Sequence, residues 1–234
     1  MKLTLKRAIA VIILMLSFAS QLAAGPLEDA VAAHDRGDYA TSLRLFRPLA
    51  EQGHASAQNN LGGMYDNGQG VPQNYAEAMK WYRLAADQGN AFAQSNLGIM
   101  YRNAYGVPQN DVEAVKWFRL AADQGNALAQ SNLGAMYAKG LGVSQNYTEA
   151  VRWYRLAGDQ GLAIAQSNLG IMYGEGHGVP QDYVRAYMWL NLAAAQGHQN
   201  AVKNLDVAAG LMTPAQIAEA QKLAREWKPT KPPR

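Results

Sequence analysis

The residues that could perform chemistry in this 234-residue chain are few, and their spacing matches no common catalytic arrangement. The sequence contains no Gly-x-Ser-x-Gly turn, Ser-x-x-Lys pair, His-Glu-x-x-His motif or Gly-Lys phosphate loop. The glycines of residues 174–178 do not make a nucleotide-binding loop, because such loops follow a β-strand and none is predicted before them. We therefore expect no catalytic residues and no cofactor.

A metal site is not expected either. His54 and His198 hold the same position of the repeat described below, but they lie four repeats apart, too far to share one ion. His177 sits among glycines and is expected to be a solvated loop residue. The chain has no cysteine, which excludes a thiolate metal site and a lipid anchor through cysteine.

Residues 1–24 have the composition of a signal peptide. Lys2, Lys6 and Arg7 precede an apolar stretch from Ala8 to Phe18, and small residues follow up to an expected cleavage point after Ala24. A membrane anchor is the alternative, but the apolar run is shorter than the ~20 residues that span a bilayer. We expect a periplasmic or secreted protein with no membrane span in the mature chain.

Removal of this segment changes the charge of the protein. Three of the 21 basic residues lie in it, which leaves 18 basic and 18 acidic residues in the mature chain. A near-neutral exported protein is not expected to bind nucleic acid.

A repeat of 36 residues organises most of the chain. The motif Ala-Gln-x-Asn-Leu-Gly begins at Ala57, Ala93, Ala129 and Ala165, and tryptophans recur with the same spacing at Trp81, Trp117, Trp153 and Trp189. A fixed period of this length is typical of stacked units that cannot bury their apolar faces alone. Such arrays offer long surfaces rather than clefts, which favours binding over catalysis.

Each unit is predicted to be a pair of antiparallel helices. In residues 90–125, apolar residues at helical spacing predict a first helix from Ala91 to about Tyr101, and glycine and proline predict a loop up to Gln109. Asn110 with Glu113 has the pattern of a capping box that opens a second helix. Gly125 stands where that helix would end in a left-handed residue. The charged positions of the second helix are expected to form a solvated outer face.

The expected divisions of the chain follow from this period: 1–24 signal peptide, 25–53 N-terminal capping unit, 54–89, 90–125, 126–161 and 162–197 complete units, 198–228 C-terminal capping helix pair, and 229–234 flexible tail. Pro48 falls inside a predicted helix and is expected to kink it. Thr213, Pro214 and Gln216 predict a capping box at the start of the last helix.

These motifs together resemble the Sel-1-like repeat, an α-solenoid family close to tetratricopeptide repeats. Ala57, Leu61, Gly62 and Tyr65 match the family's first helix, Gly70 its loop, and Ala78, Trp81, Ala85, Ala86 and Gly89 its second helix. The resemblance implies an all-α fold, a right-handed α-solenoid whose concave side is lined by first helices, and adaptor work between proteins. A cysteine-rich branch has carried β-lactamase labels, but this chain lacks every one of those cysteines. A cell-wall or β-lactam-processing hydrolase is therefore disfavoured, and a secreted factor acting on a host stays open.

Three positions in the central units depart from the repeat. Ala104 replaces the glycine found at Gly68, Gly140 and Gly176, and Ser144 replaces the loop proline. Gly158 replaces an alanine inside a second helix. If the matching glycines have positive φ, Ala104 is either strained or its loop has a different path.

The candidate binding surface is a face of the first helices whose residues vary between units. A column that the fold does not hold constant is expected to point away from the shared core. Phe92, Leu128 and Ile164 would form an apolar strip for a protein or peptide partner, unless they pack against the following unit. The full set of predicted partner-binding residues is Phe92, Ser95, Ile99, Leu128, Ser131, Ile164, Ser167 and Ile171.

Overall fold

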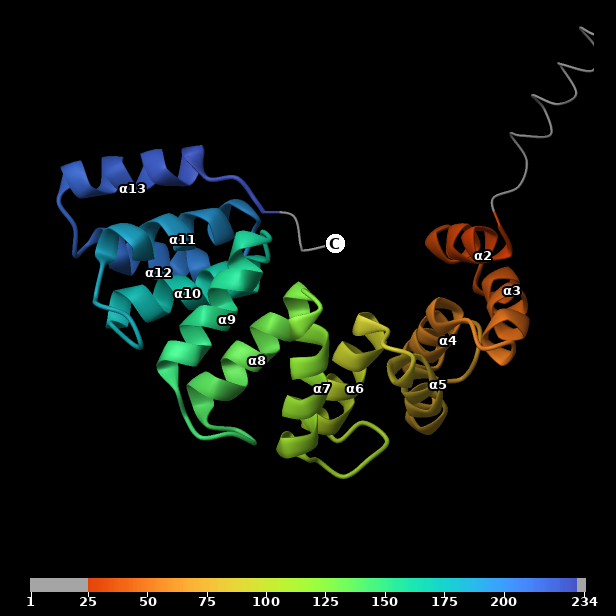
Figure 1. Cartoon of the computed structure of the whole chain (residues 1–234). Helices are drawn as coiled ribbons and strands as arrows, with labels where there is room; N and C mark the ends of the chain where they lie inside the picture. Colours follow the sequence, from red (N-terminus) through yellow and green to blue (C-terminus); the bar gives the residue numbers. More distant parts are fainter. Residues whose placement is uncertain (1–24, 231–234) are drawn as a thin grey trace, which may run out of the picture.

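The fold is an all-α solenoid built from helix pairs with a period of 36 residues. The computed structural model describes residues 25–230, so the expected signal peptide lies outside the described residues. Within that range the helices follow one another along an arc (Figure 1). Their bounds are α2 Pro26–Asp35, α3 Tyr39–Glu51, α4 Ala55–Asn67, α5 Tyr75–Asp87, α6 Ala91–Asn103, α7 Asp111–Asp123, α8 Ala127–Lys139, α9 Tyr147–Asp159, α10 Ala163–Glu175, α11 Tyr183–Ala195, α12 Gln199–Ala209 and α13 Pro214–Glu226.

The capping residues start the second helices as expected, but only half of the predicted capping box forms. The Asn110 side chain accepts a hydrogen bond from the backbone N–H of Glu113, 3.1 Å away. The Glu113 carboxylate does not return to the cap and pairs instead with Lys116, one turn further along α7. The complete box forms at Thr213 and Gln216, where α13 begins. Helix α3 continues through Pro48 to Glu51.

The units are tied together by close packing and by a repeated polar bridge. In the first helices the buried glycines lie against a large side chain of the following second helix, so that a Cβ built on Gly62 would meet Tyr82 at 2.7 Å. The buried Gln94 donates through Nε2 to the carbonyl of Ala86, 3.2 Å away, and accepts from Gln124 at 2.7 Å. The same bridge recurs at Gln58, Gln130 and Gln166. It explains why this glutamine is constant between units.

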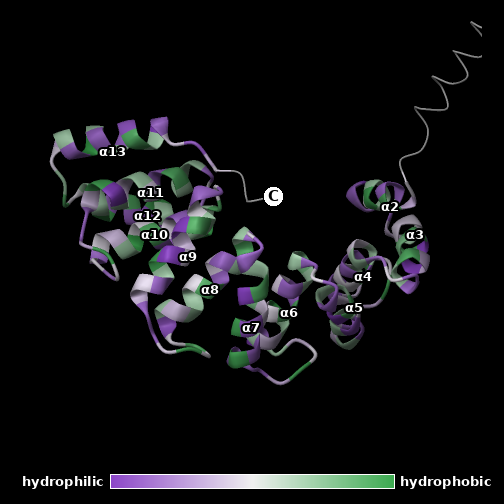
Figure 2. Ribbon diagram, viewed as in Figure 1, coloured by the Kyte–Doolittle hydropathy of each residue, from purple (hydrophilic) through white to green (hydrophobic). Residues whose placement is uncertain are grey.

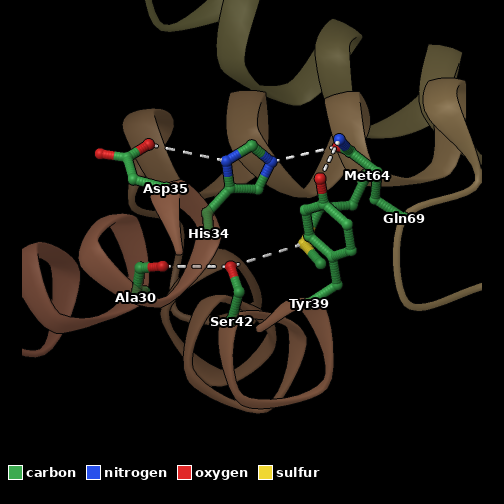
Figure 3. A network of polar contacts seen from close by, with 7 residues as sticks. All are labelled: Ala30, His34, Asp35, Tyr39, Ser42, Met64 and Gln69. Carbon is green, nitrogen blue, oxygen red and sulfur yellow. Dashed lines mark hydrogen bonds and ion pairs between the residues drawn. The ribbon is translucent and has the colours of Figure 1, made fainter. Parts of the chain in front are cut away.

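The loop of each unit packs on the start of the second helix before it. Tyr105 stacks on Tyr75 with ring centroids 5.0 Å apart, and His177 stacks on Tyr147 at 4.5 Å. His177 also pairs with Glu175 at 3.0 Å, so it is held in place rather than simply solvated. The equivalent position in the first loop is Gln69, which Figure 3 shows between the side chains of His34 and Tyr39.

This polar network closes the N-terminal end of the array. Gln69 accepts from His34 and donates to Tyr39, both at 3.1 Å, and the His34 ring meets the Tyr39 ring edge to face. The buried Ser42 hydroxyl donates to the carbonyl of Ala30, 3.1 Å away (Figure 3). Through these contacts α2 and α3 cap the first complete unit despite their divergent sequence.

The C-terminal end is built differently from the other units. Helix α13 packs against α11, where Ala220 and Ile217 join a cluster with Leu190 and Ala193. Figure 1 shows α13 lying alongside α11 at the end of the arc. The last helix therefore covers the second helix of the fourth unit. Residues 198–228 do form two helices, but α13 is seated mainly on α11 rather than paired with α12.

The first and second helices form two layers that differ in exposure. First helices of neighbouring units approach each other directly, α6 to α8 and α10 to α12, whereas the second helices α5, α7, α9 and α11 meet the next unit mainly through its first helix. Hydrophobic and hydrophilic residues alternate along the helices of both layers (Figure 2). Each helix thus buries one side and leaves another in water.

Candidate partner-binding surface

In the four complete units the first helices leave only one narrow stripe exposed. In α10 the residues Ile164, Asn168, Ile171 and Glu175 are spaced by four, three and four, and residues between them such as Leu169 and Met172 are buried. This spacing places the four side chains on one side of a helix. The same positions in the other units are Ser56, Asn60, Gly63 and Asn67; Phe92, Asn96, Ile99 and Asn103; Leu128, Asn132, Ala135 and Lys139; and Asn200, Asn204, Val207 and Leu211. We call these residues the first-helix stripe.

The apolar members predicted from the sequence are exposed on this stripe. Phe92 is 68% exposed, Leu128 45% and Ile164 46%. They do not pack away against the following unit, which was the alternative. Ile99 and Ile171 lie one turn further along the same stripe and are half-buried.

The three serines predicted to bind a partner are buried, so that part of the prediction is wrong. Ser95, Ser131 and Ser167 are each less than 5% exposed. They stand three residues after the apolar members, a step of about 300° around the helix, which turns them back toward the neighbouring helices. The step of four residues reaches the stripe instead. The Ser95 hydroxyl has no hydrogen-bond partner among the described residues, and it cannot reach a partner protein.

The stripe residue that sequence reasoning missed is the asparagine of the repeated motif. Asn60, Asn96, Asn132, Asn168 and Asn204 stand in one column, half-buried, with one amide for each unit. Asn96 donates to Asn59 at 3.2 Å, and Asn132 accepts from Arg102 at 2.7 Å. The other three side chains make no hydrogen bond to residues 25–230. The asparagine recurs in every motif of the sequence, but a residue can be constant between units either because the fold requires it or because it binds a partner.

Asparagine has a lower helix propensity than alanine, and no side-chain hydrogen bond within residues 25–230 offsets that difference at Asn60, Asn168 and Asn204. An amide presents a donor and an acceptor together. That combination matches the N–H and C=O of an extended polypeptide.

The polarity of the stripe changes along the array. At its N-terminal end a hollow of about 330 Å³ is lined by Ser56, Asn59, Asn60, Asn90 and Phe92. At its C-terminal end a hollow of about 220 Å³ is lined mainly by apolar side chains, including Ile171, Leu190, Val207 and Leu211. A partner lying along the stripe would therefore meet amides first and apolar surface last.

The stripe itself carries Lys139 and Glu175, and Arg102 lies beside it. The Arg102 guanidinium bonds Asn132 and lies over the Phe118 ring, 5.8 Å from its centroid. Partial burial raises the pKa of the Asp66 carboxyl above its ordinary value, opposed by a hydrogen bond from the Tyr82 hydroxyl. The same neighbourhood raises the pKa of Tyr82, mainly through burial.

The described part of the chain offers no other arrangement typical of an active centre. Among residues 25–230 no three His, Asp or Glu side chains gather closely enough to hold a metal ion. None of the helices described is both long and apolar enough to cross a bilayer.

Comparison with known proteins supports the same architecture. The model of the Sel1 repeat matches residues 55–90, 91–126, 127–162 and 163–198. Among curated proteins, no sequence matches the chain.

Solved structures of similar proteins carry the same fold. A Sel1 repeat protein from Oxalobacter formigenes is 33% identical over 87% of this chain and 83% of that chain, with a TM-score of 0.75. A protective antigen of uropathogenic Escherichia coli with an SLR fold is 37% identical over 80% of this chain, with a TM-score of 0.76, but this chain spans only 40% of its length. An immunity protein from Pseudomonas aeruginosa, 23% identical over 85% of this chain and 79% of that chain, with a TM-score of 0.52, is alike in fold alone. The four matched repeats cover more than half of the sequence, and the chain belongs to the Sel1 repeat family.

Proposed function

We propose that this protein is a non-enzymatic scaffold that binds an extended segment of a protein partner along the first-helix stripe, after export to the bacterial envelope. The Sel1 fold is typical of protein-interaction scaffolds, which supports the general class.

The observation that carries the proposal is the exposed row of Phe92, Leu128 and Ile164. Phe92 is the most exposed of these side chains, at 68%, and apolar anchors that become buried on binding usually dominate recognition. The asparagine column lies beside them and supplies hydrogen bonds for a main chain. Together they favour a peptide that runs along the units rather than a compact ligand.

The test is capture of envelope proteins by a triple variant, Phe92→Ser, Leu128→Ser and Ile164→Ser. The matched control is Leu84→Ser, Leu120→Ser and Leu156→Ser, because these leucines are 41–49% exposed, have the same spacing and lie on the second helices. Circular dichroism first establishes that both variants keep their helix content. We expect the stripe variant to lose the partner and the control to retain it, with partners identified by mass spectrometry.

Two outcomes would contradict the proposal. If the stripe variant captures the same proteins as the wild type, the binding site lies elsewhere, for instance in the loops around Tyr105 and His177. If only the leucine control loses the partner, the second helices carry the function. A turnover assay with nitrocefin or peptidoglycan addresses the hydrolase alternative, for which we expect no activity.

Export is supported by the sequence of residues 1–24 alone. The positive start, apolar stretch and small residues before Gly25 are those of a cleaved signal. Fractionation of cells that express the full chain, followed by N-terminal sequencing, should give a mature protein that begins at Gly25. An uncleaved chain that stays in the cytoplasm would contradict this part of the proposal.

A further inference from the structure

A second surface, separate from the first-helix stripe, lies where the chain after α13 returns to the third complete unit. Trp227 meets the Trp189 ring edge to face, with centroids 6.2 Å apart, and lies with Pro229 beside Gly161. The backbone N–H of Thr230 then donates to the carbonyl of Asp159, 2.7 Å away. The start of the expected flexible tail is therefore seated on the end of α9.

Thr230 stands at the rim of a groove between the ends of α7 and α9. The groove has a volume of about 300 Å³, and its wall includes Asp123, Trp153, Leu156 and Asp159. Leu156 is an exposed apolar residue there, and Trp153, which also lines the groove, is almost fully buried. The groove therefore combines an apolar surface with two carboxylates.

The charges of the groove are incompletely balanced. Neither Asp123 nor Asp159 forms a salt bridge within residues 25–230. Partial burial raises the pKa of the Asp159 carboxyl despite the opposing effect of the nearby Arg155, so a further cation would relieve a desolvated charge. The cation within the groove wall, Arg152, is engaged by Glu149 and lies over the Trp153 ring.

We propose that the last residues of this chain, Lys231-Pro-Pro-Arg234, occupy this groove and latch the C-terminal end onto the third complete unit. Four residues after Thr230 reach at most about 13–14 Å, and Asp123 and Asp159 line the same groove, so the segment can extend from Asp159 toward Asp123. Its two basic residues complement the two carboxylates, and its prolines fit an extended backbone against Leu156 and Trp153.

The latch can be tested with a pair of engineered cysteines, because the natural chain has none. The test pair is Leu156→Cys with Pro232→Cys in the full mature chain. The matched control is Leu84→Cys with Pro232→Cys, which places the first thiol at the same position two units away, beyond the reach of the tail. Non-reducing gels under mild oxidation distinguish intramolecular from intermolecular disulfides.

We expect the intramolecular disulfide of the test pair to form at least about tenfold faster than that of the control pair. Docking of the tail would keep the effective concentration of the two thiols high. Adding Lys231→Glu and Arg234→Glu to the test pair should slow closure several-fold, because like charges would then meet in the groove. Equal closure rates in both pairs would overturn the latch. A test pair that gives only disulfide-linked dimers would also overturn it, because the occupant would then be a second copy. This experiment does not involve the first-helix stripe, so its failure would leave the proposed function standing.

Discussion

The two helix layers differ in how tightly they are packed and in what they leave exposed. In the first layer a Cβ on Gly62 would lie 2.7 Å from Tyr82, whereas in the second layer a Cβ on Gly158 would lie 3.5 Å from the nearest atom, a normal contact distance. The first layer exposes one narrow stripe that varies between units. The second exposes ion pairs formed within each helix, together with the leucines Leu84, Leu120 and Leu156. The first-helix layer therefore combines the closest internal packing with an exposed stripe whose residues vary between units.

The largest expected change in stability comes from adding a methyl group at a buried glycine of the first helices. Gly62→Ala should lower the free energy of unfolding by about 1–3 kcal/mol, because the buried ring of Tyr82 would have to move. Thermal and urea denaturation measure the change.

The control is the next residue along the same helix. A Cβ on Gly63 would meet only the Tyr82 hydroxyl oxygen at 3.6 Å, so Gly63→Ala should be neutral or stabilise by up to ~1 kcal/mol through helix propensity. Equal changes in stability at the two positions would show that close packing against Tyr82 is not the reason for a glycine at position 62.

The loop that joins the layers gives the second prediction. Ala104 has φ of 59°, the left-handed conformation that its counterparts Gly68, Gly140 and Gly176 adopt. The strain expected from the sequence is therefore present. Ala104→Gly should raise the free energy of unfolding by about 1 kcal/mol.

The reverse substitution, Gly68→Ala, tests the same loop in another unit. It should destabilise by a similar amount, since it imposes the same strain at φ of 68°. A gain in stability from Gly68→Ala would mean that the left-handed position tolerates a side chain.

The smallest effect is expected in the second layer. Gly158→Ala should stabilise by up to ~1 kcal/mol, because alanine fills the same place at Ala86, Ala122 and Ala194 and nothing lies closer than 3.5 Å. A lower melting temperature would instead reveal a close approach to Gln166 or Trp189 that the second layer depends on.

The helical architecture could be predicted because it follows from local signals repeated in phase. The period located each helix, and the glycines after the second helices, such as Gly125 with φ of 87°, have the predicted left-handed conformation. The ends were harder. Nothing local indicates that α13 seats on α11 or that Thr230 bonds Asp159, because both contacts join segments that are far apart in the sequence.

The candidate site could be predicted only in its variable positions. Phe92 and its equivalents were found because they differ in a column whose neighbours do not, and they are exposed. The serines Ser95, Ser131 and Ser167 were grouped with this column but are buried. Each lies three residues after the apolar residue, whereas the residue four positions after it lies on the stripe. The asparagine column was hidden by its constancy, which a fold requirement would produce equally well.

The most direct test of the central claim, that the stripe binds the partner, asks whether this asparagine column serves function or fold. Asn60, Asn168 and Asn204, which make no side-chain hydrogen bond within residues 25–230, would be replaced together by alanine. The melting temperature and the affinity for the captured partner would be measured on the same protein. We predict weaker binding with a melting temperature that is unchanged or higher, because alanine favours the helix and no intramolecular bond is lost. Unchanged affinity with a lower melting temperature would show that the amides serve the fold, and would contradict the account.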